Sequence, residues 1–114
     1  MLMPALFSYG TLQQREVQLA NYGRALEGQP DVLGGYKLAA LTIADPRVVD
    51  VSGKAVHVIA RVTNDPADRI FGFVFELTGA ELASTDAYEV DAYSRVEVTL
   101  ESGRPAWVYV GPRL

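Results

Sequence analysis

The chain has 114 residues, a net charge of −4 and no cysteine. Its length predicts one domain, residues 1–114, which buries enough surface for a single core without disulfide bonds. The lack of cysteine excludes thiol catalysis and thiolate metal sites, and a single histidine, His57, excludes sites that need two. We therefore expect no metal and no cofactor. The acidic balance, without a basic cluster, argues against a nucleic-acid partner.

Targeting signals are not evident in the sequence. Residues 1–7 lack the positive flank of a signal peptide, and no apolar run reaches the length that spans a membrane. We therefore expect no membrane partner and a cytoplasmic location. The sequence does not indicate an oligomeric state.

The first elements in chain order are predicted to be a strand and a helix. Pro4–Tyr9 is a short apolar run typical of a buried strand, and Leu12–Tyr22 is compatible with a helix. Leu12, Leu19 and Leu26 recur every seven residues, so we expect them to share one stripe. Gly10 separates the strand from the helix.

The middle and end of the chain are predicted to be mainly β-structure. Gly28–Asp31 and residues 44–54 are expected to be loops, and Val32–Ile43 is expected to hold one or two strands. Gly34-Gly35 indicates a bulge or a close backbone approach. Further strands are predicted at Ala55–Val62, Ile70–Leu77, Tyr93–Leu100 and Pro105–Val110.

A second helix is predicted over Thr78–Glu89. Thr78 and Glu81 form a capping-box pattern, and Leu77 and Leu82 occupy the positions of a hydrophobic staple. The strands and helices do not alternate regularly along the chain. We therefore predict an α+β fold, in which a mixed, curled β-sheet or small β-barrel carries two or more short helices.

Tyr9-Gly10-Thr11-Leu12 is the first candidate site. A strand, a glycine and a helix start place backbone N–H groups at the end of a sheet, where they can receive an anion. An ordinary strand-to-helix turn is the alternative explanation of the same four residues.

Glu89 is the second candidate, and its role depends on where the helix ends. If the helix runs through Tyr88, Glu89 lies on the face of Leu82 and points toward the core or a cavity next to it. Burial and the helix dipole would then raise the pKa of its carboxyl, as a general acid or base requires. If the helix ends earlier, Glu89 is a solvated loop residue. Asp86 is expected to cap the helix or to face solvent.

Tyr93 and Arg95 attract interest because they lie close to Glu89 in the sequence. Tyr93 is able to donate its hydroxyl into the same cavity, although a half-buried tyrosine on a strand is the commoner arrangement. Trp107 and Tyr109 are expected to cover one face of the last strand.

The chain resembles the gamma-glutamylcyclotransferase-like superfamily, including its avirulence-induced-gene-like members. Four segments carry the resemblance in the family's order: Phe7–Leu12, Gly72–Leu77, Asp86-Ala87-Tyr88-Glu89 and Tyr93–Val96. The resemblance covers essentially the whole chain. It implies a small mixed β-barrel with short helices, in agreement with the predicted elements.

The resemblance also implies a reaction and roles for the two candidate segments. In the family, the loop equivalent to Tyr9–Leu12 binds the α-carboxylate and amine end of a gamma-glutamyl group, and the glutamate equivalent to Glu89 is the acid/base. The substrate's own α-amine attacks its γ-carbonyl, which releases 5-oxoproline and a free amine. The implied partner is therefore a small gamma-glutamyl amine or amide, with Tyr93 near it.

One departure from the family pattern bears on this expectation. Many members have glycine after the glutamate, whereas this chain has Val90-Asp91. A glycine there would end the helix in a left-handed turn, which valine adopts only with strain. A non-catalytic domain of the same fold, binding a small carboxylate or serving as an accessory domain, is therefore the alternative.

Overall fold

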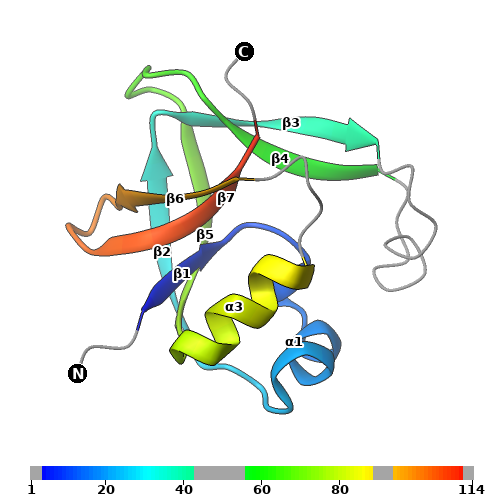
Figure 1. Ribbon diagram of the computed structural model, residues 1–114. Coiled ribbons are helices and arrows are strands. Elements are labelled where there is room, and N and C mark those ends of the chain that lie inside the picture. Colours follow the sequence, from blue (N-terminus) through cyan, green and yellow to red (C-terminus); the bar gives the residue numbers. More distant parts are fainter. Residues whose placement is uncertain (1–3, 43–55, 89–93, 112–114) are drawn as a thin grey trace.

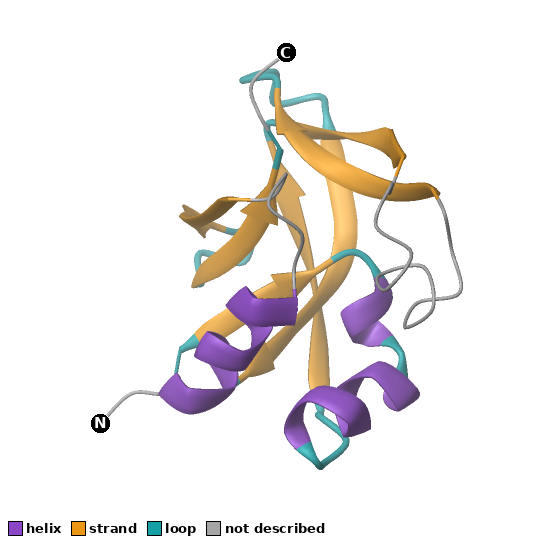
Figure 2. Ribbon diagram, turned by 45° about the vertical axis from the view of Figure 1, so that its right-hand side comes forward, coloured by secondary structure: helices purple, strands orange, loops and turns teal. Residues whose placement is uncertain are grey.

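The computed structural model describes residues 4–42, 56–88 and 94–111. In this part of the chain, a curled sheet carries its helices on one side (Figures 1 and 2). The elements are β1 (Ala5–Ser8), the 3-10 turn η1 (Thr11–Gln13), α1 (Arg15–Tyr22), β2 (Gly28–Gly34), β3 (Tyr36–Thr42), β4 (Val56–Val62), β5 (Arg69–Glu76), α3 (Gly79–Tyr88), β6 (Ser94–Thr99) and β7 (Pro105–Val110).

The sheet is mixed and does not close into a barrel. Its strands lie in the order β2-β5-β1-β7-β4-β3, and β6 pairs with β7 outside this path. β7 runs parallel to both β1 and β4, whereas the other pairs are antiparallel. The predicted α+β fold with a mixed, curled sheet is confirmed.

β7 has three neighbours, so two of them must share one of its edges. β6 pairs along the whole of β7. β1 is in register with β7 at Leu6 and Trp107, and β4 at Ala60 and Val110. A strand offers only two edges for hydrogen bonding, so β1 and β4 meet the remaining edge of β7 one after the other. This branch point sits where β1 ends.

Alternation along the strands divides the core into two clusters. Ala5 and Phe7 of β1 point into the concave side of the sheet, where they meet Val74 and Val108. Leu6 points to the opposite side and packs under the helices, together with Leu12, Val17, Leu77, Leu82 and Tyr109. The helices are therefore held to the sheet by the second cluster.

Two glycines are required by the curled sheet. A Cβ at Gly72 would lie 2.4 Å from the backbone oxygen of Ser8, so β5 can approach β1 this closely only with glycine there. Gly35 lies between β2 and β3 and has a φ of 80°, a left-handed backbone conformation that glycine adopts easily. The predicted Val32–Ile43 block is therefore two strands with a corner between them.

The predicted loop at Gly28–Asp31 is wrong, because these residues form the first half of β2. Gly28–Gly34 pairs continuously with β5, and this tertiary partner overrides the low strand propensity of glycine, proline and aspartate. β2 is an edge strand in the described sheet. Pro30 has no N–H to donate, and an edge strand tolerates this because one of its sides has no neighbouring strand to bind.

The predicted stripe of Leu12, Leu19 and Leu26 is also wrong. Gln14 has an extended conformation and separates η1 from α1. Residues before and after it therefore do not follow one helical repeat, and Leu12 and Leu19 do not share a helix face. Leu12 is buried, but Leu19 is 44% exposed. Val17 and Gln18 are the buried residues of α1.

The predicted start of the second helix is confirmed. The N–H of Glu81 donates to Oγ1 of Thr78 at 3.0 Å, and the N–H of Thr78 donates to Oε1 of Glu81 at 2.8 Å. Leu77 and Leu82 are both buried in the core below the helices. α3 ends at Tyr88, so the orientation predicted for Glu89 lies outside the described residues.

Glu81 also joins the two helices through an ion pair. Nε and Nη2 of Arg24 donate to its two carboxylate oxygens, each at 2.8 Å. These bonds, with those from Thr78, outweigh desolvation and lower the pKa of Glu81 from 4.5 to about 2. Nearby, the Tyr22 hydroxyl and Oγ1 of the buried Thr85 lie 2.5 Å apart.

This ion pair predicts an acid-sensitive contribution to stability. Because the folded-state pKa of Glu81 is depressed, its contribution is present above pH 4.5 and is lost as pH falls toward 2. Urea unfolding between these pH values should show a shallower loss of stability for Glu81→Gln than for the unaltered protein. The exposed Glu97 provides the control, and an equal flattening in Glu97→Gln would contradict the assignment.

Candidate active site

The hydroxyl of Tyr9 fills the branch point of the sheet. It donates to the carbonyl oxygen of Tyr109 on β7 at 2.5 Å, and it accepts from the N–H of Ala60 on β4 at 3.0 Å. A tyrosine hydroxyl has one proton and free lone pairs, so it satisfies both backbone groups. The strand β1 ends at Ser8, and the side chain of the next residue therefore spans the gap between β7 and β4.

The candidate loop begins directly after this anchored tyrosine. Gly10 is followed by η1, whose turn is closed by the N–H of Gln13 donating to the oxygen of Gly10 at 3.1 Å. Gly10 does not have a positive φ. A Cβ added there would have no neighbour within 4 Å among the described atoms. The backbone conformation therefore does not require glycine, but its lack of a side chain leaves the surface of the loop open.

Gln18 holds the far side of the loop, although its sequence pattern gives no indication of this role. Its buried side-chain amide donates to the oxygen of Leu12 at 2.9 Å and accepts from the N–H of Leu26 at 2.8 Å. The side chain of Leu12 is itself buried in the core. Polarity alone places a glutamine on the solvent side of a helix, so no sequence signal distinguished this one.

The last turn of α3 is bound to β6 and β7 through Asp86. The Tyr109 hydroxyl donates to Oδ1 of Asp86 at 2.6 Å. Arg95 donates to both carboxylate oxygens, from Nε at 2.8 Å and from Nη2 at 3.1 Å. Partial burial acts to raise the pKa of Asp86, but these hydrogen bonds outweigh it and hold the pKa below its ordinary value.

Asp86 is exposed, as expected, but its carboxylate also binds the last hairpin. Its carboxylate accepts hydrogen bonds from Arg95 and Tyr109 of the last hairpin, and the residues next to Asp86 in the sequence do not indicate these partners. The guanidinium of Arg95 also lies 4.4 Å from the ring centroid of Trp107. The prediction that Trp107 and Tyr109 cover one face of β7 is confirmed, since both pack in the cluster below the helices.

Tyr109 connects the two candidate segments. Its carbonyl oxygen accepts from Tyr9, which precedes Gly10, and its hydroxyl donates to Asp86, which lies three positions before Glu89. Figures 1 and 2 both show the carboxyl end of α3 next to the turn that leaves β1. Glu89 and Tyr93 lie outside the described residues, so their positions remain predictions, as does ligand binding by residues Tyr9–Leu12.

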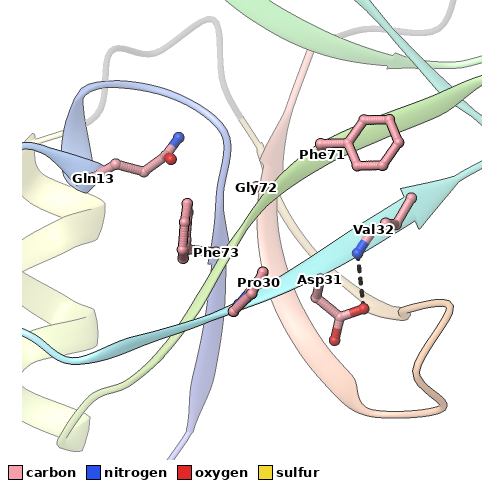
Figure 3. A pocket seen from close by; sticks show the side chains of 7 residues that line it. All are labelled: Gln13, Pro30, Asp31, Val32, Phe71, Gly72 and Phe73. Atoms are coloured by element: carbon pink, nitrogen blue, oxygen red, sulfur yellow. Dashed lines mark hydrogen bonds between the residues drawn. The ribbon is translucent and has the colours of Figure 1, made fainter.

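An open apolar hollow flanks the loop on the side of β2 and β5 (Figure 3). Its volume is about 410 Å³, and Phe73 and Gln13 lie on its side nearest to the loop. Phe73 is in register with Ser8 across the β1–β5 pair. The hollow is lined by Gln13, Pro30, Asp31, Val32, Phe71, Gly72 and Phe73.

Two further features concern the described ranges 4–42, 56–88 and 94–111: clusters of metal-ligating side chains and long apolar helices. Within them, no group of three or more histidine, aspartate or glutamate side chains is arranged to hold a metal ion. No helix in this part of the chain has the length and apolar character needed to cross a membrane.

A family model described as gamma-glutamyl cyclotransferase, AIG2-like, matches residues 6–113. The chain belongs to this family. The match includes both candidate segments and the hairpin that joins them. A search among curated proteins returns no significant match.

Several solved structures have the same fold as this gamma-glutamyl cyclotransferase-family chain, and their chains are longer. An Arabidopsis thaliana protein solved in solution is 21% identical with a TM-score of 0.72, and the match covers 97% of this chain and 63% of that one. A gamma-glutamyl cyclotransferase gives a TM-score of 0.72 at 17% identity, with coverages of 96% and 66%.

A third similar structure is the Kluyveromyces lactis allophanate hydrolase. It is 18% identical with a TM-score of 0.72, and the match covers 96% of this chain but only 17% of that one. The family's fold therefore also occurs as a small part of a much larger protein.

The branch point predicts a stability effect for Tyr9→Phe. Removing the hydroxyl leaves the N–H of Ala60 and the carbonyl of Tyr109 without this partner, which costs about 1–3 kcal/mol for a buried group. Urea unfolding measures the loss. Tyr36→Phe on β3 provides the control, and equal losses in the two variants would contradict the role of the branch point.

Proposed function

We propose that this protein is a gamma-glutamyl cyclotransferase that acts on a small gamma-glutamyl amine or amide. The observation that carries the proposal is the link through Tyr109. In a chain of this family, the residue before the Gly10 loop and the last turn of α3 are bound to one residue of β7. This link supports the proposal because Tyr9 and Asp86, which belong to the two segments that the family resemblance singles out, are far apart in sequence but bind the same residue.

The proposed reaction is an internal aminolysis. The α-nitrogen of the substrate forms a bond to its γ-carbonyl carbon, and the bond from that carbon to the departing nitrogen breaks. The α-ammonium loses two protons in becoming the lactam nitrogen of 5-oxoproline, and the departing amine gains two in leaving as an ammonium ion. No protein nucleophile is needed, which suits a chain without cysteine.

The protein's part in this reaction is to fold the substrate back on itself and to move protons. In our proposal, backbone groups of Tyr9–Leu12 hold the α-carboxylate end, so that the amine lies close to the γ-carbonyl. Glu89 accepts a proton from the α-ammonium and returns it to the departing nitrogen. The Tyr93 hydroxyl is proposed to donate a hydrogen bond in the same cavity.

The proposal is tested by incubating the purified protein with a panel of gamma-glutamyl amines and gamma-glutamyl dipeptides. Release of 5-oxoproline together with a stoichiometric amount of free amine from at least one compound is the expected result. No release from any member of the panel would contradict the proposal.

Glu89→Gln should abolish most of the turnover. The amide keeps the shape of the side chain but cannot transfer the proton, and loss of a general acid/base costs about 10²–10⁴-fold in rate. kcat on the substrate found in the panel measures the effect. Glu27→Gln, at an exposed position between α1 and β2, should leave kcat unchanged.

Gly10→Val should weaken ligand binding without lowering stability. A Cβ at this position meets no described atom within 4 Å, and we expect the valine side chain to extend into the space proposed for the ligand. Calorimetric titration with 5-oxoproline measures binding, and thermal unfolding measures stability. Gly79→Val is the matched control, because a Cβ at Gly79 likewise has no described neighbour within 4 Å. Unchanged affinity in Gly10→Val would remove the loop from the site.

The accessory-domain alternative is favoured by one specific observation. The same fold makes up a small part of a much larger hydrolase. Under this alternative, 5-oxoproline or a related carboxylate binds, but no gamma-glutamyl compound is turned over. The substrate panel and the titration together separate the two functions.

A further inference from the structure

The last turn of α3 carries a charge that its own helix does not favour. Asp86 lies two residues before the end of the helix at Tyr88, and residues 85–88 include no basic side chain. The carboxyl end of a helix carries the negative end of its dipole, so an acidic residue there is destabilising unless other groups compensate it. The compensation in this protein comes from another part of the fold.

Three side chains of the last hairpin surround this carboxylate or support its partners. Tyr109 donates one hydrogen bond to it and Arg95 donates two. Trp107 lies under the guanidinium of Arg95, so the planar side chain has little freedom. We call Asp86, Arg95, Trp107 and Tyr109 the helix-end clamp.

We propose that the helix-end clamp positions the acid/base of the reaction. The inference rests on the proposed function. Glu89 is the next residue in the sequence after Tyr88, the last described residue of α3, so a hold on this turn acts on the chain immediately before it. The clamp holds this turn to β7 at Tyr109, the same residue whose carbonyl binds Tyr9 before the ligand loop. The clamp therefore sets the acid/base against the loop without contacting the substrate.

The sequence after α3 makes this role more important. Val90 follows Glu89, and valine is not a residue that favours the left-handed turn of a local C-cap. The clamp constrains the last described turn of α3 from another part of the fold. Misplacement of a catalytic group by about 1 Å is enough to cost about 10²-fold in rate.

The chain offers a matched control for the clamp. Arg69 donates from Nε and Nη2 to both oxygens of Glu101, at 2.7 and 2.8 Å, and lies 5.2 Å from the ring centroid of Phe71. This pair repeats the arginine–carboxylate–aromatic arrangement of the clamp, but on β5 and the β6–β7 turn. Arg69→Lys therefore perturbs the same kind of interaction away from α3.

The experiment compares Tyr109→Phe, Arg95→Lys and Arg69→Lys in steady-state kinetics on the substrate identified in the panel. The two clamp variants should lower kcat by about 10- to 100-fold, with KM changed by less than about threefold, because they alter geometry rather than binding. Arg69→Lys should leave both constants unchanged. Tyr109→Phe removes only a hydroxyl, and Arg95→Lys provides a second test if the phenylalanine variant folds poorly.

A second comparison distinguishes positioning from a general loss of structure. In the Glu89→Gln background, adding Tyr109→Phe should cause no further fall in kcat, because the group that the clamp positions is already absent. Equal fold-losses in both backgrounds, or an unchanged kcat in both clamp variants of an active protein, would overturn the inference alone. Absence of turnover by the unaltered protein would overturn the proposed function and this inference with it.

Discussion

The hydroxyl of Tyr9 binds two backbone groups of the sheet at the branch point between β7 and β4. β7 passes from β1 to β4 along a single edge, and between them the carbonyl of Tyr109 and the N–H of Ala60 meet a side chain instead of a strand. An unpaired backbone group in this position would carry a desolvation cost of about 1–3 kcal/mol. The curled shape of the sheet thus depends on a tyrosine at the end of β1, and the candidate loop starts at the next residue.

A structural residue and the candidate ligand loop are neighbours in the sequence, and both sides of the turn are anchored. Tyr9 fixes where the chain leaves the sheet, and the buried amide of Gln18 fixes Leu12 on the other side of the turn. Gly10 lies between the two anchors, and a Cβ there would have no described atom within 4 Å. A loop whose two ends are held by the core presents its backbone in a constant position, which is what binding a small charged group requires.

The helices depend on polar contacts as well as on the apolar cluster below them. Arg24, just after the end of α1, binds Glu81 of α3, and Tyr22 of α1 binds the buried Thr85 of α3. At the other end of α3, Asp86 is bound by the last hairpin. α3 is thus held at its start by its capping box and α1 and at its end by β6 and β7. Both contacts link segments that are distant in the chain.

The amino-acid sequence determined the features that depend on near neighbours. The capping box of Thr78 and Glu81, the alternation of β6 and the fold class follow from local chemistry and periodicity, and the four motif segments were sufficient to indicate the family. The sequence failed where a distant partner decided the outcome. Gly28–Asp31 became a strand because β5 pairs with it, and the interruption at Gln14 turned Leu19 outward.

The partners of Tyr9, Gln18 and Asp86 were likewise decided by tertiary structure. Each of these side chains can form hydrogen bonds with many kinds of group, including water. Its neighbours in the sequence therefore do not specify its partner. Only the curl of the sheet brings Tyr109 within reach of both Tyr9 and Asp86. The sequence alone therefore indicated the family and the candidate segments, whereas the tertiary structure decided which side chains hold those segments together.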